Sequence, residues 1–216
     1  MSRETTASGV AGRWRHIGAM AVVLFAALTP AAATESTAQG VVDQFHRSLI
    51  GVMTRAGELG YHGRFEALSP EIARAFHIPV MARIVAGKHW KTFSGGQKSA
   101  LVEAFGRMTA ATYANRFDGY SGERFRILGE TPTRRKSVIV KSEIVKSNGE
   151  SIAINYLMRK FKRGWRVVDV QLKGVYSELA TRRSEYSSIL RRSGLATLLS
   201  KIADKVAAYE TEAQGK

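Results

Sequence analysis

The chain has 216 residues, contains no cysteine and carries a formal net charge of +15 at pH 7. Without cysteine there can be no disulfide, no thiol nucleophile and no lipidated amino-terminal cysteine. So strong a basic charge indicates nucleic acid, a membrane surface or an acidic protein as partner, unless it serves solubility alone.

The first 33 residues have the features of a secretory signal peptide. Arg13 and Arg15 form a basic segment, residues 17–28 are apolar, and small residues follow up to Ala33. This apolar run is shorter than the ~20 residues of a membrane span, which argues against a retained anchor. We predict export with cleavage near Ala33, which removes three arginines and one glutamate and leaves a single domain over 34–216 with a formal charge of +13. Export argues against a nucleic-acid partner and leaves anionic lipid headgroups or an acidic protein surface.

Helical periodicity dominates residues 36–120. A Ser-x-x-Gln capping box at Ser36 precedes an apolar stripe over 42–56, which predicts a first helix. Three glycines between 57 and 63 are expected to end it.

Two short helices are expected next. Ser69-Pro70 would begin one of them, and Ile78-Pro79 would end it and begin the other, which Gly87 closes. His77 lies near these helix ends, where we expect it to be a cap or a solvated group rather than a ligand.

A longer helix with a broad apolar face follows. Ser94 and Gln97 form its capping box, and Phe105, Met108 and Tyr113 lie on its apolar face. The helix also carries small alanines, which admit either a neighbouring element or a ligand chain.

From residue 123 the hydrophobic period changes to twofold. Four runs alternate apolar and polar residues: 124–130, 136–146, 150–161 and 165–173. Thr131-Pro132 and Asn148-Gly149 are expected to form turns between them, and Asn-Gly is the strongest hairpin signal. We therefore predict an α+β fold, in which a four-stranded antiparallel meander over 123–174 and a helical layer enclose an apolar pocket.

The last strand separates two kinds of side chain. Val168, Val170 and Leu172 are expected on the apolar face, and Asp169 on the solvent face. Ser177 is then placed to cap a carboxyl-terminal helical region over 177–210, which Gly194 divides into two helices.

Catalytic motifs are missing. The sequence has no His-Glu-x-x-His, no nucleophile elbow, no dinucleotide fingerprint and no cluster with metal-ligand spacing, so we expect neither enzyme activity nor a cofactor or metal. The alternative is a cavity enzyme of the ketosteroid-isomerase type, in which Tyr113, Tyr156 and Asp169 would share an apolar cavity. Placing Asp169 on the solvent face argues against it.

The carboxyl-terminal half resembles the MlaC-like family of periplasmic lipid-binding proteins, also called toluene-tolerance auxiliary proteins. The segments that carry this resemblance are Tyr156-Leu157-Met158-Arg159, Trp165-Arg166-Val167-Val168-Asp169-Val170, Gly174-Val175 and Arg183-Ser184-Glu185-Tyr186, followed by Ile189-Leu190-Arg191-Arg192. Residues 177–185 are most similar to the hopanoid-associated branch, HpnM.

The resemblance implies a periplasmic shuttle that holds phospholipid or hopanoid tails between sheet and helices, exchanges them with membrane-bound lipid-transport complexes and supports outer-membrane lipid organisation. The apolar residues that we expect to contact lipid are Phe105, Met108, Tyr113, Val140, Ile154, Tyr156, Val168, Val170 and Leu172, each of which would otherwise be ordinary core. The cations that we expect to meet anionic headgroups or a partner are Arg134, Arg135, Lys136, Lys162 and Arg163.

Overall fold

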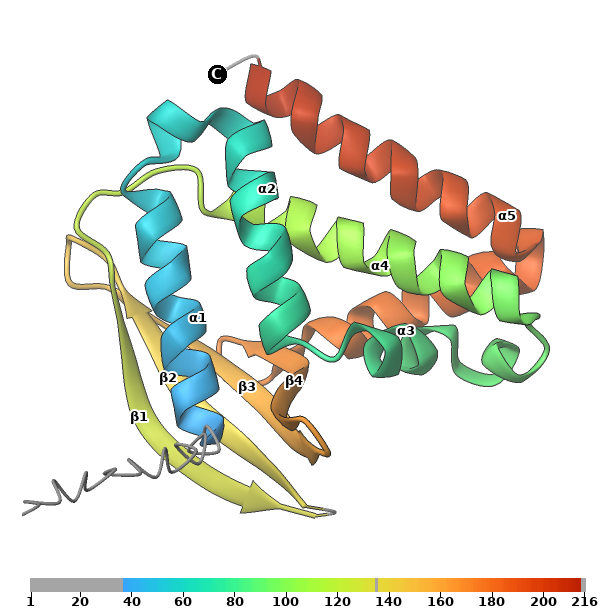
Figure 1. Ribbon diagram of the computed structural model, residues 1–216, viewed down its shortest axis with the longest axis horizontal. Coiled ribbons are helices and arrows are strands. Elements are labelled where there is room, and N and C mark those ends of the chain that lie inside the picture. Colours follow the sequence, from blue (N-terminus) through green and yellow to red (C-terminus); the bar gives the residue numbers. More distant parts are fainter. Residues whose placement is uncertain (1–36, 135, 215–216) are drawn as a thin grey trace, which may run out of the picture. The chain divides into compact units, whose positions relative to one another are not determined.

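An antiparallel sheet with helices on one side forms the part of the chain that the computed structural model describes, residues 37–134 and 136–214 (Figure 1). In chain order the elements are α1 (Ala38–Met53), α2 (Ala56–Ala75), α3 (Ile78–Ala86), the 3-10 helix η1 (Gly87–Lys91), α4 (Gly95–Arg116), β1 (Arg124–Thr133), β2 (Ser137–Val145), β3 (Ser151–Phe161), β4 (Gly164–Leu172), β5 (Tyr176–Ser177) and α5 (Glu178–Gln214). The predicted α+β class is confirmed, and β5 is an additional strand. The predicted signal peptide, its cleavage near Ala33 and the side chain of Arg135 lie outside the described residues.

The sheet is a meander with strand order β1-β2-β3-β4-β5, every neighbouring pair antiparallel. The prediction of a turn at Thr131-Pro132 is wrong, because both residues pair with β2 and the chain turns only after Thr133. Proline is tolerated there because β1 is an edge strand, so the missing N–H need not remove a bond from the sheet. None of the described helices has the length and hydropathy needed to cross a membrane.

A β-bulge changes which residues of β4 face the helices. Leu157 pairs with Asp169 but Met158 pairs with Val167, so Val168 is the extra residue between them. Val167 therefore shares a face with Val170 and Leu172, and the predicted strict alternation from Val168 to Leu172 is wrong, although Val168 is itself buried, at 2% exposed. Strict alternation along the sequence cannot reveal a bulge, which shifts the side-chain phase by one residue.

The first two helices also differ from the prediction. The cap of α1 is Thr37, whose hydroxyl accepts a hydrogen bond from the amide of Gly40, so the helix begins one residue later than a cap at Ser36 would place it. The chain then forms α2, which kinks at Gly60 and continues through Pro70. Ser69 does not cap a new helix; its hydroxyl donates to the carbonyl of Phe65, one turn earlier.

The predicted caps of α3 and α4 and the break at Gly194 are confirmed, whereas α5 runs to Gln214, beyond the predicted end at 210. Ser94 and Gln97 form the reciprocal capping box of α4, His77 caps α3, and Gly87 ends α3 with a positive φ. Gly194, with φ of 76°, breaks α5 into two segments, and the second segment runs beside α4 (Figure 1).

Aromatic side chains join the helices to the sheet. Phe45 of α1 lies 5.2 Å, between ring centroids, from both Phe76 and Tyr113, and it makes an edge contact with Tyr156 of β3. Tyr156 is 1% exposed, and its hydroxyl lies 3.1 Å from Nε2 of His46. Phe76, Tyr113 and Tyr156 of this cluster also line the cavity between the sheet and α4.

Candidate binding cavity

A cavity of about 200 Å³ lies between the helix-facing side of β3 and β4, helix α4 and the start of α5. The residues around it are Phe76, Met81, Phe105, Thr109, Thr112, Tyr113, Arg116, Phe117, Ile154, Tyr156, Asp169, Val170, Leu172, Glu178, Leu179 and Arg182. Most of them are apolar or aromatic, and the charged ones come from α4, β4 and α5. The cavity is therefore mainly apolar, with charged side chains on one part of its lining.

Local sequence explains the apolar walls. Ile154 and Tyr156 are two residues apart on β3 and face the same side of the sheet, where they pair with Leu172 and Val170 of β4. Phe105 and Tyr113 are two turns apart on α4 and face the sheet. Burial raises the pKa of Tyr113 and Tyr156 well above the ordinary value, so both side chains are neutral.

The predicted lipid-contacting residues divide into two groups. Six of them line the cavity: Phe105, Tyr113, Ile154, Tyr156, Val170 and Leu172. The other three do not: Met108 lines an adjoining cavity, Val140 is fully buried in the core, and Val168 is the bulged residue of β4. Whether the six contact a lipid stays a prediction.

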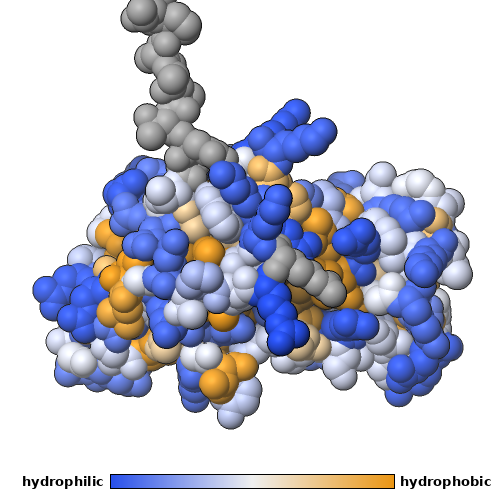
Figure 2. All heavy atoms as spheres, turned by 90° about the horizontal axis from the view of Figure 1, so that it is seen from below, coloured by the Kyte–Doolittle hydropathy of each residue, from blue (hydrophilic) through white to orange (hydrophobic). Residues whose placement is uncertain are grey.

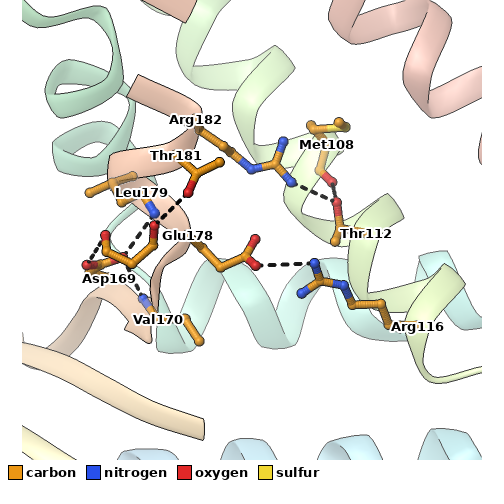
Figure 3. Close-up of polar contacts among 10 residues, drawn as sticks. Met108, Thr112, Arg116, Asp169, Val170, Glu178, Leu179, Thr181 and Arg182 are labelled. Carbon is orange, nitrogen blue, oxygen red and sulfur yellow. Dashed lines mark hydrogen bonds and ion pairs between the residues drawn. The ribbon is translucent and has the colours of Figure 1, made fainter. Parts of the chain in front are cut away.

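Two arginines and a glutamate form the polar end of the cavity (Figure 3). Nη2 of Arg116 on α4 lies 3.3 Å from Oε1 of Glu178 on α5, and both side chains are partly exposed. Arg182, one turn further along α5, donates to the hydroxyl of Thr112 at 3.3 Å. These contacts tie α4 to the start of α5 at the point where the cavity reaches solvent.

The prediction that Asp169 lies on the solvent face is wrong, because this residue is only 8% exposed. Its carboxylate accepts hydrogen bonds from the amides of Val170 and Leu179 and from the hydroxyl of Ser177 (Figure 3). The Ser177 hydroxyl in turn accepts from the amide of Ala180, so its predicted capping role is confirmed. Burial raises the pKa of Asp169, and the hydrogen bonds oppose that rise.

Sequence reasoning missed Arg116, Glu178, Arg182 and Thr112. Arg116 and Glu178 are separated by 62 positions, so no local spacing relates them. Arg182 and Glu178 are four residues apart, a spacing that places them on one helix face, but the sequence does not say that this face adjoins a cavity.

The three residues of the isomerase alternative, Tyr113, Tyr156 and Asp169, share this cavity. The Tyr156 hydroxyl already has His46 as a hydrogen-bond partner, and the Asp169 carboxylate accepts three hydrogen bonds that hold the start of α5, so both have a structural role. Within the described ranges, no three His, Asp or Glu side chains are grouped so that they could hold a metal ion.

Basic side chains gather at one end of the sheet. The β1–β2 turn, with Arg134 and Lys136, and the β3–β4 turn, with Lys162 and Arg163, lie at the same end because Ser137 pairs with Arg159. A concave surface of about 410 Å³ beside it is lined by Arg47, Arg74, Arg163 and Arg166 together with Gly40, Val41, Gln44 and Ala75. The face seen from below in Figure 1 is mainly hydrophilic, with separate apolar patches between the polar side chains (Figure 2).

Known proteins resemble the chain in both sequence and fold. A family model described as MlaC protein matches residues 34–204. The intermembrane phospholipid transport system binding protein MlaC of Haemophilus influenzae is 27% identical over 124 residues, which are 55% of this chain and 56% of that protein. The chain thus spans a little over half the length of this curated relative. A phospholipid-binding protein from Ralstonia solanacearum, solved in complex with a phospholipid, matches with a TM-score of 0.70 over 80% of this chain and 98% of that one; at 19% identity the likeness shows the fold.

Proposed function

Because the chain belongs to the MlaC family, we propose that it is a periplasmic carrier that binds a membrane lipid by its apolar part and moves it between membranes. The observation that supports this most is the apolar cavity between β3, β4, α4 and α5, which ends in charged groups. Phospholipid is the first candidate cargo, since both relatives are named for it. A hopanoid is the second, and membrane-bound lipid-transport complexes are the proposed partners.

Cavity size sets a condition on this function. A volume of about 200 Å³ equals roughly seven water molecules at ~30 Å³ each. It is below the ~300 Å³ at which sites for drug-sized ligands begin. Two acyl chains do not fit into this space, so the carrier must hold part of the lipid outside it or move α4 and α5 away from the sheet.

Retained lipid is the direct test. Purified protein should release about one lipid per chain on extraction with organic solvent, measured by mass spectrometry. A Thr109→Arg variant, which places a charge against the apolar wall, should retain much less, because an unpaired charge is costly to bury. Thr92→Arg, at an exposed position outside the cavity, is the matched control and should retain the normal amount. Wild-type protein that never retains lipid would contradict the proposal.

We also propose that the basic end of the sheet contacts an anionic surface during loading or release. Reversing Arg134, Arg135 and Lys136 to glutamate should abolish binding to anionic vesicles at low salt, because each cation near such a surface contributes about 1 kcal/mol. The control reverses three exposed cations elsewhere, Arg55, Lys91 and Arg191, and therefore carries the same net charge. Equal loss in both variants would assign the effect to total charge rather than to this end of the sheet.

A further inference from the structure

A second cavity of about 410 Å³ adjoins the apolar one, between α4 and the two segments of α5. We call it the polar chamber. Arg116, Glu178 and Arg182 line both cavities, so these three side chains form the boundary between them. A molecule lying across this boundary would have one part among apolar side chains and the other among charged ones.

Positive charge predominates in the polar chamber. Its lining holds four cations, Arg116, Arg182, Lys201 and Lys205, against the two carboxylates of Glu178 and Glu185. Within residues 37–134 and 136–214, only Arg116 of the four forms an ion pair, with Glu178. The lining therefore holds two more cations than carboxylates, and this excess favours an anionic ligand.

A buried tyrosine hydroxyl lies in the same chamber, beside Arg182. The Tyr186 oxygen is buried and has no hydrogen bond of good geometry within the described residues. Burial raises the pKa of Tyr186, and the neighbouring Arg182 guanidinium opposes that rise. The Tyr186 ring packs edge-on against Phe105, which lines the apolar cavity. A ligand oxygen that reaches the boundary would meet Arg182 and Tyr186 together and would give the buried hydroxyl an acceptor.

We infer that the polar chamber is the headgroup subsite of the carrier and that it takes a phosphate-bearing headgroup, with Arg116 and Arg182 as the phosphate ligands. This inference rests on the proposed function, which places at least part of the lipid's apolar portion in the apolar cavity. Arginine presents paired N–H donors that match phosphate oxygens, and Arg182 exchanges its long bond to the neutral Thr112 hydroxyl for bonds to an anion. Phosphate also displaces Glu178 from Arg116, whereas a neutral headgroup lacks the charge to do so.

The role of Glu178 gives the inference a second, opposite prediction. Glu178 neutralises Arg116 when no anion is present and competes with a phosphate when one is. Glu178→Gln should therefore strengthen phospholipid binding, while Arg116→Gln and Arg182→Gln should weaken it by about tenfold or more each, as expected for loss of a hydrogen bond to a charged group.

The experiment compares two lipids with identical acyl chains on delipidated mature protein: phosphatidylglycerol, and diacylglycerol, which lacks the phosphate. Bound lipid is quantified by mass spectrometry after gel filtration. Arg182→Gln should weaken phosphatidylglycerol binding about tenfold or more relative to its effect on diacylglycerol binding. The matched control is Arg183→Gln, an exposed neighbour outside the chamber, which should bind both lipids normally. Inorganic phosphate alone, titrated by calorimetry, should bind far more weakly than phosphatidylglycerol.

The outcomes separate this inference from the function on which it rests. If wild-type protein binds neither lipid, the carrier function itself fails. If it binds both lipids equally and Arg182→Gln changes neither, or if that variant loses both alike, the carrier stands and the phosphate site is refuted. Inorganic phosphate that binds as tightly as phosphatidylglycerol would make the chamber a site for free phosphate and also refute the headgroup assignment.

Discussion

Filling the apolar cavity should stabilise the lipid-free protein and remove its lipid binding at the same time. An enclosed dry void costs about 24 cal/mol per Å³, so the stability lost to this cavity of about 200 Å³, which reaches solvent at its charged end, is at most about 5 kcal/mol. Leu172 lines the cavity from β4, where a tryptophan is compatible with a strand. If the indole of Leu172→Trp fills about half of the space, the free energy of unfolding should rise by up to about 2 kcal/mol.

Two measurements on the same variant decide the matter. Urea unfolding of delipidated protein gives the stability change, and mass spectrometry of the purified protein gives the lipid retained. Leu128→Trp is the control, because Leu128 is 59% exposed on β1 and does not line the cavity. A Leu172→Trp protein that is destabilised and still carries its full complement of lipid would refute the reasoning, since the cavity would then be neither an unfilled void nor the place where the chains bind.

Three further predictions concern the frame around the cavity. Asp169→Ala should lower the free energy of unfolding by about 2–3 kcal/mol because it leaves buried donors at the start of α5 unpaired, and Asp169→Asn, which keeps an acceptor, should lose less in urea titration. Burial lowers the pKa of His46 in the folded protein from 6.5 to about 4, so stability is full above pH 6.5 and should fall by up to about 3 kcal/mol as the pH drops toward 4. When the free energy of unfolding is plotted against pH, His46→Gln should remove this fall, and a substitution of the exposed His62 should leave it unchanged. Ser94→Ala should cost about 1 kcal/mol by removing the cap of α4, while Ser99→Ala, exposed in the same helix, should cost much less in thermal unfolding.

Local signals predicted those parts of the fold that local interactions determine. The Ser94 capping box, the end of α3 at Gly87 and the break at Gly194 each depend on residues within one helical turn, and each is confirmed. The errors occur where tertiary packing outweighs such a signal. Pro70 was expected to begin a helix but lies inside α2, because the helix is held by its buried face.

The site was harder to predict than the fold because it depends on contacts between distant segments. An apolar residue on a strand can line a cavity or pack in a closed core, and its sequence context is the same in both cases. Ile154 lines the cavity, whereas Val140, on the same face of the sheet, is fully buried beneath the helices. Asp169 followed a polar alternation that normally indicates solvent, yet its carboxylate binds the first turn of α5. Only the fold decides between these outcomes.

A carrier must also release its cargo, and the energetics of this cavity bear on that step. An acyl chain that leaves a bilayer for the cavity moves from one apolar medium to another, so burial at about 0.8 kcal/mol per methylene cancels to first order. The void that the chain fills remains, at most about 5 kcal/mol for 200 Å³, together with the contribution of the charged end. That amount corresponds to a preference of at most about three to four orders of magnitude for the loaded protein. If the chain acts as the proposed carrier, a movement that presses α4 and α5 onto the sheet would remove the void and with it the preference for the loaded protein.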